Sequence, residues 1–134
     1  RGGLSLVRDI RYLGSVPAQL QVRSDRCDHM PWGLAGGEDG TPSYVVLNPG
    51  MPDERQLKAM DTTTIKQGEI VRLVCPGAAG WGNPFERDPV AIAADVQEGR
   101  LTSSYVRDHY GVAVDEDGTL DQAESKRLRA INRL

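Results

Sequence analysis

One short stretch of this sequence holds three side chains with very different chemistry. Cys27-Asp28-His29 places a thiol, a carboxylate and an imidazole in a row. Adjacent side chains of an extended chain point to opposite sides, so only Cys27 and His29 could share one. A structural zinc site needs about four ligands, and the sequence contains no second cluster of Cys or His. A polar loop is the favoured interpretation, and a metal or thiol site is the alternative.

The other candidates for chemistry have simpler structural interpretations. His109 follows Asp108 near the end of a predicted helix, where a cation interacts favourably with the helix dipole. Residues 115–118 (DEDG) lack the alternating acidic residues and the glycine at position six of a calcium loop, and they predict a tight turn. Residues 76–84 (PGAAGWGNP) lack the Gly-Lys-Ser/Thr of a phosphate-binding loop, so a structural turn is favoured there.

Strands must position these residues in the first half of the chain. Residues 4–12 and 18–22 both show apolar side chains at every second position, which predicts two half-buried strands. Residues 14–17 (GSVP) supply a turn, so the two strands are predicted to form an antiparallel hairpin. Further strands are predicted at 44–47 and at 69–75, the latter entered through a turn at Gln67-Gly68.

Helical signals fill the last third. Asp88 followed by Pro89 predicts a helix start, and Gly99 predicts its end, with Ile92 and Val96 on its apolar face.

Two more short helices are predicted after Gly99. Thr102 is predicted to cap the second helix, and Leu101 and Val106 are placed to form a hydrophobic staple across its start. This helix is predicted to end at Gly111, before a short strand at 112–114. Asp121 with Glu124 fits a capping box for a final helix. The apolar face of that helix is predicted to consist of Leu128, Ile131 and Leu134.

This order predicts an α+β fold, with an antiparallel β-rich N-terminal two-thirds followed by short C-terminal helices. We expect a single domain over residues 1–134, mainly strands in 1–76, a Gly-rich turn in 77–87 and mainly helices in 88–134. The 16 Lys and Arg residues are scattered and the net charge is −3, which argues against nucleic acid as a partner. No apolar run is long enough to cross a membrane. Two cysteines alone are typical of reduced thiols in a cytoplasmic protein.

Several blocks, taken together, resemble the hydantoinase B/oxoprolinase family. Residues 1–8 (RGGLSLVR) are similar to its R-G-G-x-G-x-x-R stretch, with Ser5 where glycine is usual. Residues 23–37 contain RSDR and PWGLAGG, similar to its R-S-D-R…P-W-G-L-x-G-G block, in which a larger apolar residue is frequent at position 35. Residues 76–89 resemble P-G-G-G-G-[YW]-G-[DN]-P-x-E-R-D-P, with Ala78 and Ala79 in place of two glycines.

This resemblance implies an ATP-dependent hydrolase of cyclic amides, of the hydantoin or 5-oxoproline type, or a related ketone carboxylase. ATP with magnesium, and a further divalent metal, would belong to the full enzyme rather than to this chain. The implied partners are a hydantoinase A-like ATP-binding subunit and an N-terminal part of the same subunit. Because the chain opens at Arg1 inside a motif, we expect a C-terminal fragment without a complete active site, and we assign no catalytic or metal-binding residue.

Six residues of these motifs are candidates for contact with substrate or with another subunit. They are Arg23, Arg26, Trp32, Gly36, Gly37 and Trp81. The planar fork of arginine suits carboxylate or phosphate recognition. The alternative is that Arg23 and Arg26 pair with nearby carboxylates such as Asp25 and Asp28 while Trp32 packs in the core. A self-sufficient binding module is the competing function.

Overall fold

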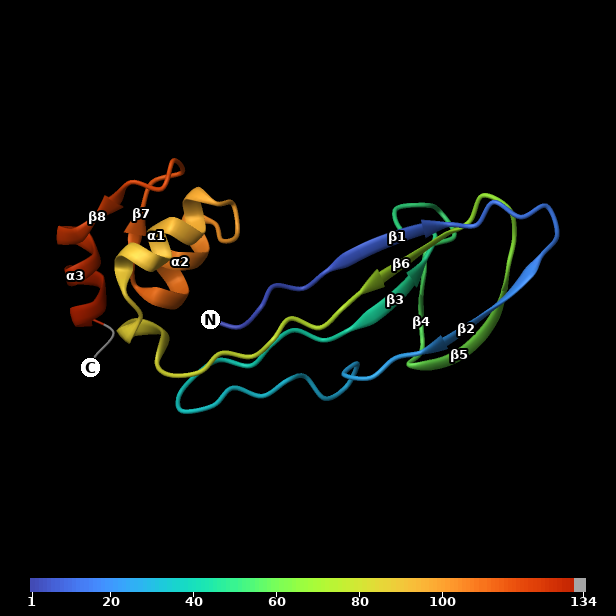
Figure 1. Cartoon of the computed structure of the whole chain (residues 1–134), viewed down its shortest axis with the longest axis horizontal. Helices are drawn as coiled ribbons and strands as arrows, with labels where there is room; N and C mark the ends of the chain where they lie inside the picture. The colour runs from blue at the N-terminus through green and yellow to red at the C-terminus, as the bar shows by residue number, and fades with distance from the viewer. Residues whose placement is uncertain (132–134) are drawn as a thin grey trace. The chain divides into compact units, whose positions relative to one another are not determined.

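The computed structural model describes residues 1–131, which fall into two compact units. Unit 1 comprises residues 1–33 and 38–80, and unit 2 comprises residues 34–37 together with the chain from Trp81 onward. Each unit has its own hydrophobic core. Antiparallel sheets occupy the first two-thirds of the chain and three short helices follow, which confirms the predicted α+β class (Figure 1).

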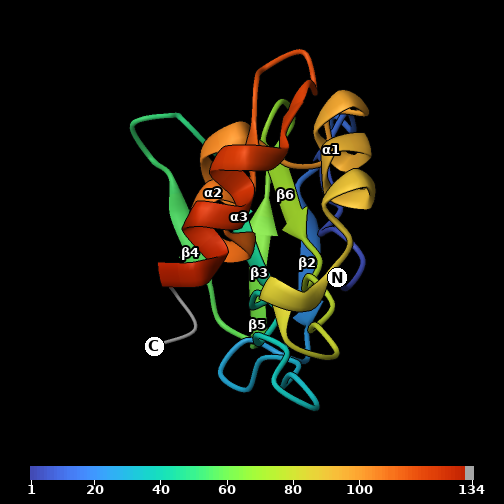
Figure 2. The ribbon, with the colours of Figure 1, turned by 90° about the vertical axis from the view of Figure 1, so that its left-hand side faces the viewer.

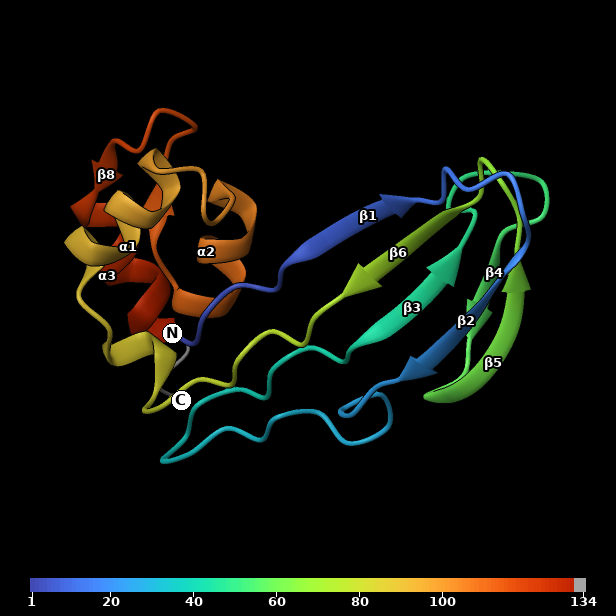
Figure 3. The same cartoon turned by 45° about the vertical axis from the view of Figure 1, so that its right-hand side comes forward.

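Six strands form unit 1, and all of their pairings are antiparallel. They are β1 (Val7–Arg11), β2 (Ala18–Arg23), β3 (Tyr44–Leu47), β4 (Arg55–Leu57), β5 (Met60–Ile65) and β6 (Ile70–Val74). One sheet has the order β1-β6-β3-β4, and β2 pairs with β5 in a second, two-stranded sheet (Figure 3). The core of this unit consists of Val22, Val45, Leu47, Leu57, Ile65 and Val71, with partly buried side chains packed against it.

The predicted hairpin between residues 4–12 and 18–22 is wrong. β1 pairs with β6 and β2 pairs with β5, so residues 14–17 connect two sheets instead of two neighbouring strands. The end of β1 is bound to the turn before β6, because Tyr12 N–H donates to the Glu69 carbonyl at 2.9 Å and Gly68 N–H donates to the Tyr12 carbonyl at 2.8 Å. These hydrogen bonds join positions that are distant in sequence, which local periodicity cannot register.

The burial of the two predicted strands also differs. In β2 the alternation is confirmed, since Ala18, Leu20 and Val22 are buried or half-buried and the residues between them are exposed. All five residues of β1 are exposed, so its predicted half-burial is wrong. β1 is an edge strand that pairs with β6 alone, and none of its side chains belongs to the core of unit 1.

Strands β4 and β5 were not predicted. β5 has the sequence MDTTTI, and its run of threonines contains no alternation of apolar and polar residues. Threonine is nevertheless common in strands because its branched Cβ fits the pleated surface. The strand propensity of threonine is therefore the sequence signal that favours β5. The predictions for β3 and β6 are confirmed, as is the turn before β6, where Gly68 has a φ of 90°.

Unit 2 contains the helical elements, whose ribbons are labelled in Figure 2. They are η1 (Pro84–Glu86), α1 (Pro89–Gln97), α2 (Ser103–Tyr110), β7 (Ala113–Val114), β8 (Leu120–Asp121) and α3 (Gln122–Ile131). Asp88 caps α1 by accepting from Val90 N–H, and Thr102 caps α2 by accepting from Tyr105 N–H, as predicted. Gly111 ends α2 with a φ of 60°, and the predicted turn at 115–118 closes through Gly118 N–H and the Asp115 carbonyl at 3.0 Å.

The core of unit 2 gathers side chains from α1, α2 and β7. Its buried members are Ile92, Ala93, Val96, Val106, Tyr110, Val112 and Val114, with Leu101 and Leu120 packed against them. The apolar face predicted for α3 is buried only in part. Leu128 is half-buried, Ile131 is exposed, and Leu134 lies outside the described residues. Ser125 is the buried residue of α3, because its hydroxyl accepts from Ala113 N–H at 3.0 Å. Within residues 1–131, no helix is long and apolar enough to cross a membrane.

Candidate functional site

Two of the candidate residues, Arg26 and Trp32, lie together in unit 1. The guanidinium carbon of Arg26 lies 5.4 Å from the centre of the Trp32 ring, within the range of a cation–π interaction. Trp32 is 64% exposed, so it is not a core residue. Within residues 1–131, neither Arg23 nor Arg26 forms an ion pair with Asp25 or Asp28. The packed and ion-paired alternative is therefore contradicted, and both side chains are presented at the surface.

Ser43 fixes the backbone that carries Arg26, a role that no sequence pattern predicts. Ser43 is 5% exposed. Its N–H donates to the Arg26 carbonyl at 3.0 Å, and its hydroxyl donates to the Asp25 carbonyl. Arg26 has a φ of 61°, in a region that a residue with a side chain rarely adopts. Two hydrogen bonds from one buried residue hold the loop in this conformation.

The loop that carries Trp32 is closed by two further hydrogen bonds. Asp39 accepts from Gly33 N–H at 2.8 Å, and Gly40 N–H donates to the Pro31 carbonyl at 2.8 Å. Both bonds use backbone groups beside the tryptophan and none uses its indole. The ring is therefore left available for contact on an otherwise tied loop.

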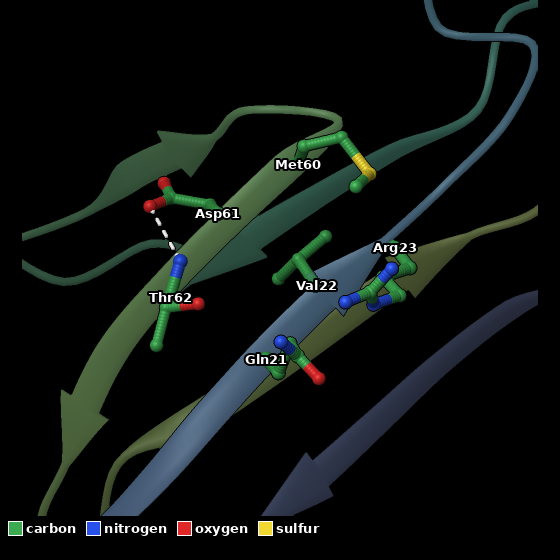
Figure 4. A pocket seen from close by; sticks show the side chains of 6 residues that line it. All are labelled: Gln21, Val22, Arg23, Met60, Asp61 and Thr62. Carbon is green, nitrogen blue, oxygen red and sulfur yellow. Dashed lines mark hydrogen bonds between the residues drawn. The ribbon is translucent and has the colours of Figure 1, made fainter.

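Arg23 lies elsewhere in unit 1, at the end of β2. It lines a shallow, open depression with Gln21, Val22, Met60, Asp61 and Thr62 (Figure 4). The Asp61 carboxylate accepts from the N–H groups of Thr62 and Lys58, so it stabilises the start of β5. The depression brings one guanidinium beside a methionine and polar side chains, and it does not include Arg26 or Trp32.

The glycine candidates, Gly36 and Gly37, belong to a tight turn in unit 2. Gly37 N–H donates to the Leu34 carbonyl at 2.9 Å, and both central residues have positive φ, 50° at Ala35 and 87° at Gly36. A turn with two such residues matches the type I′ geometry, which favours glycine and asparagine. Ala35 therefore occupies a strained backbone position, and Gly36 an unstrained one.

Trp81 is joined to this turn through the backbone. Leu34 and Trp81 form an isolated β-bridge, and Gly82 N–H donates to the Leu34 carbonyl at 2.9 Å. The Trp81 side chain is 77% exposed. The structure thus brings together Gly36, Gly37 and Trp81 in one unit and Arg26 with Trp32 in the other.

Cys27 and His29 do not share a metal-binding cluster. No group of three or more His, Cys, Asp or Glu side chains that could hold a metal occurs in the described part of the chain. The Cys27 sulfur lies 3.5 Å from the Ser43 hydroxyl, which places it in the same hydrogen-bonded loop. His29 is exposed.

The Gly-rich segment at 76–80 packs its backbone between two others in unit 1. Ala78 N–H donates to the Gly3 carbonyl at 3.0 Å, and Thr41 N–H donates to the Gly77 carbonyl at 3.3 Å. Gly77 N–H in turn donates to the Thr41 hydroxyl at 2.9 Å. Ala78 and Ala79 both have ordinary negative φ angles, so the two alanines fit where the family pattern has glycine.

Carboxylates in both units form ion pairs with arginines. Asp9 on β1 pairs with Arg72 on β6 at 2.7 Å, and this hydrogen bond lowers the pKa of the Asp9 carboxyl. In unit 2 the buried Asp95 pairs with Arg87 at 2.6 Å and with Arg100 at 3.4 Å. Glu124 receives hydrogen bonds from Arg127 and Arg107, which lower its pKa to about 2. These ion pairs connect the three carboxylates to arginines of their own unit.

Comparison with known proteins identifies relatives of this chain. The family model described as hydantoinase B/oxoprolinase matches residues 1–84. The caprolactamase subunit beta of Pseudomonas jessenii is 39% identical over 69 residues, which cover 52% of this chain and 12% of that protein. Two relatives that match 98% of this chain are covered over only 22% and 23% of their own length. The chain thus spans less than a quarter of the curated relatives that it matches from end to end.

Two solved structures share its fold. The ATP-dependent caprolactamase from Pseudomonas jessenii matches with a TM-score of 0.80 and 28% identity, over 97% of this chain and 23% of that chain. An acetone carboxylase matches with a TM-score of 0.60 and 20% identity, over 76% of this chain and 18% of that chain, a likeness of fold alone. The family match covers more than half of the chain and includes the Arg26–Trp32 loop and the Gly-rich segment. The chain belongs to the hydantoinase B/oxoprolinase family.

Proposed function

We propose that this chain is a C-terminal structural part of a hydantoinase B-like subunit in an ATP-dependent cyclic-amide hydrolase. In the proposed reaction, one water opens the ring by cleaving the C–N bond of the amide, and ATP is hydrolysed to ADP and phosphate with a second water. A hydantoinase A-like partner subunit would bind ATP with magnesium in the cytoplasm. The chain itself would support the active site without supplying a complete one.

The likeness to the ATP-dependent caprolactamase carries this proposal. Caprolactam is a cyclic amide, and this chain shares the fold of that enzyme over 97% of its length at 28% identity. The family description, hydantoinase B/oxoprolinase, names two further cyclic-amide substrates. Substrates of this class share a ring amide whose hydrolysis is coupled to ATP in the caprolactamase, which supports the same reaction class here.

A structural role is supported by how the charged groups are used. Asp9, Asp95 and Glu124 are each bound to arginines in their own unit, which ties their charge to the fold. Arg26 and Trp32, by contrast, are exposed on a loop that is fixed by hydrogen bonds. A rigid loop with exposed cationic and aromatic groups suits contact with another part of the enzyme or with a substrate carboxylate.

Reconstitution tests the proposed reaction. The natural subunit that contains this chain, combined with its ATP-binding partner, should open caprolactam, hydantoin or 5-oxoproline only when ATP and magnesium are present. Mass spectrometry would detect the ring-opened amino acid, and a coupled assay would detect ADP. Ring opening without ATP would contradict the proposal, and so would hydrolysis by the 134-residue chain alone.

A ketone carboxylase is the second candidate function, favoured by the shared fold with acetone carboxylase at a TM-score of 0.60. With ATP and magnesium, the same reconstituted enzyme should then convert acetone and bicarbonate to acetoacetate and water, hydrolyse ATP, and leave all three cyclic amides intact. A stand-alone binding module is separated by calorimetric titration of the 134-residue chain with ATP, hydantoin or 5-oxoproline. Micromolar binding would favour the module, and an absence of heat would favour the structural role.

A further inference from the structure

The edge of β1 that faces away from β6 presents unpaired backbone groups. Cys75 N–H donates to the Leu6 carbonyl, and Tyr12 N–H donates to the Glu69 carbonyl, so the even-numbered residues face β6. Alternate residues of an antiparallel strand direct their N–H and C=O groups to opposite edges. The N–H and C=O groups of Val7, Asp9 and Arg11 therefore point to the free edge, which lies at the rim of the sheet in Figures 1 and 3.

The hydrophobic core of unit 1 ends abruptly at this strand. Ile10, Val71 and Leu47 form one row across β1, β6 and β3, because Ile10 pairs with Val71 and Val71 pairs with Leu47. Leu47 is 2% exposed and Val71 is 5% exposed, whereas Ile10 at the end of the same row is 48% exposed. The row is thus covered at its centre and open at the β1 edge.

Further apolar side chains extend this opening along the chain. Leu6 lies on the same face as Ile10, and it and the preceding Leu4 are each more than half exposed. Val7, on the opposite face, is also more than half exposed. Natural edge strands are usually protected by charge, bulges or short length, because an apolar edge pairs with other strands. In β1 the charge of Asp9 is neutralised by Arg72, so it gives little protection. Arg8 and Arg11 keep the edge positively charged, which disfavours pairing with a strand of like charge and favours pairing with an acidic one.

We propose that a β-strand from the remaining part of the hydantoinase B-like subunit pairs with the free edge of β1. The fitting strand carries apolar residues beside Leu6 and Ile10, an acidic residue beside Arg8 on the same face, and an acidic residue beside Arg11 on the opposite face. Room for such a segment exists in the relatives, since this chain matches only 23% of the caprolactamase chain that shares its fold. This inference rests on the proposed function, because the partner strand is taken from the same hydantoinase B-like subunit.

Hydrogen exchange at single amides tests this pairing and carries its own control. In the 134-residue chain alone, the amides of Val7, Asp9 and Arg11 should exchange quickly, and those of Arg8 and Ile10 slowly. In the natural subunit, mass spectrometry with electron-transfer fragmentation should find the first three slowed about 100-fold or more. Equal exchange of Val7, Asp9 and Arg11 in both samples would overturn the proposal.

Two other occupants of the edge give different results. Slowing that rises with concentration of the isolated chain, together with a dimer in sedimentation, would identify a second copy and overturn the proposal. Slow exchange in the isolated chain at every concentration would mean that the chain covers its own edge, with the same consequence. The ring-opening assay is independent: failed catalysis with retained protection would reject only the proposed reaction.

A pair of substitutions separates assembly from folding. Ile10→Lys should leave the urea midpoint of the isolated chain nearly unchanged, because Ile10 is already half exposed, and should remove the protection of Val7 and Asp9 in the natural subunit. Val90→Lys in unit 2, which is 62% exposed, is the matched control and should leave that protection in place. Loss of protection in both variants, or in neither, would contradict the assignment.

Discussion

The backbone N–H of Ser43 donates a 3.0 Å hydrogen bond to the carbonyl of Arg26, and this bond holds Arg26 at a φ of 61°. The Ser43 hydroxyl adds a second bond, to the Asp25 carbonyl, and lies 3.5 Å from the Cys27 sulfur. One buried serine thus connects the candidate contact loop to the strand β3 that follows it.

Ser43→Ala should loosen this loop. Removing the hydroxyl deletes the hydrogen bond from the buried Ser43 to the Asp25 carbonyl and leaves longer contacts from Ser24 and Cys27, which should lower the free energy of unfolding by about 1 kcal/mol. The half-buried Cys27 should also react faster with a thiol reagent, while the exposed Cys75 should keep its rate. Ser15→Ala, at an exposed position, is the control. An unchanged Cys27 rate in a destabilised variant would mean that Ser43 does not hold the loop.

Asn48 should be one of the most sensitive positions in unit 1. It is 2% exposed at a φ of 55°, and its amide group donates to Asp53 and Glu69 and accepts from Ile70 N–H. Asn48→Gly keeps the backbone angle but loses these bonds, at a cost of about 2–3 kcal/mol. Asn48→Ala should cost about 1 kcal/mol more, because alanine resists positive φ. Urea unfolding measures both, and equal losses would show that backbone strain contributes nothing.

Asp95 should dominate the stability of unit 2. Its carboxylate is 4% exposed and pairs with Arg87 and Arg100, so Asp95→Asn leaves a partly buried guanidinium without its counter-charge. We expect a loss of about 3 kcal/mol in the free energy of unfolding. Glu98→Gln removes an exposed partner of Arg100 and should cost less than about 1 kcal/mol. A comparable loss in both variants would contradict a special role for the buried carboxylate.

Glu124 should make stability depend on pH in the acid range. Hydrogen bonds from Arg127 and Arg107 lower its pKa to about 2 from the usual 4.5. Because the folded pKa is the lower one, its contribution is complete above about pH 4.5 and is lost as the pH falls toward 2. The difference in melting temperature between wild type and Glu124→Gln should shrink across that window.

A direct titration checks the cause of that shift. Carboxyl NMR should place the Glu124 midpoint near 2 in the wild type and move it upward in Arg127→Gln. A midpoint that stays in place would assign the shift to something other than this arginine.

The two tryptophans should report on the surroundings of their loops. Trp32 and Trp81 are 64% and 77% exposed, so acrylamide should quench the fluorescence of both in the isolated chain. Trp32→Phe and Trp81→Phe leave one reporter each. If the candidate residues contact a partner, quenching of the remaining tryptophan should fall in the natural subunit. Equal quenching in the isolated chain and in the subunit would remove that tryptophan from the candidate set.

Helix boundaries could be predicted from the sequence because their signals are local. Asp88, Thr102 and Gly111 act on backbone groups within a few residues, and all three perform the predicted roles. The pairing of strands could not be predicted in the same way, because paired strands can be far apart in sequence. Asp9 and Arg72 meet across 63 positions of sequence, and nothing in the periodicity of β1 identifies β6 as its partner. The short loop at 14–17 therefore favours a hairpin, which the observed pairing contradicts.

The candidate contact residues show the same division between local and distant causes. The turn at 34–37 has a local cause, because Gly36, one of its two central residues, adopts a φ of 87° without strain. The exposure of Trp32 depends on the hydrogen bonds of Asp39 and Ser43, which position the chain around it without involving the indole. A large aromatic residue next to glycines is equally compatible with a core and with a surface. The hydrogen bonds that close the loop leave the Trp32 side chain at the surface.

Three backbone segments of unit 1 that are far apart in sequence approach one another closely, and this limits which residues each of them can contain. A Cβ added at Gly2 would lie 2.1 Å from the Ala78 carbonyl oxygen, and one added at Gly40 would lie 2.0 Å from that of Gly77. Gly2 and Gly40 are therefore the positions that cannot accept a side chain, whereas residues 78 and 79 tolerate alanine. The clashing atoms are backbone carbonyl oxygens, which no substitution at 77 or 78 removes, so positions 2 and 40 should remain glycine across the family.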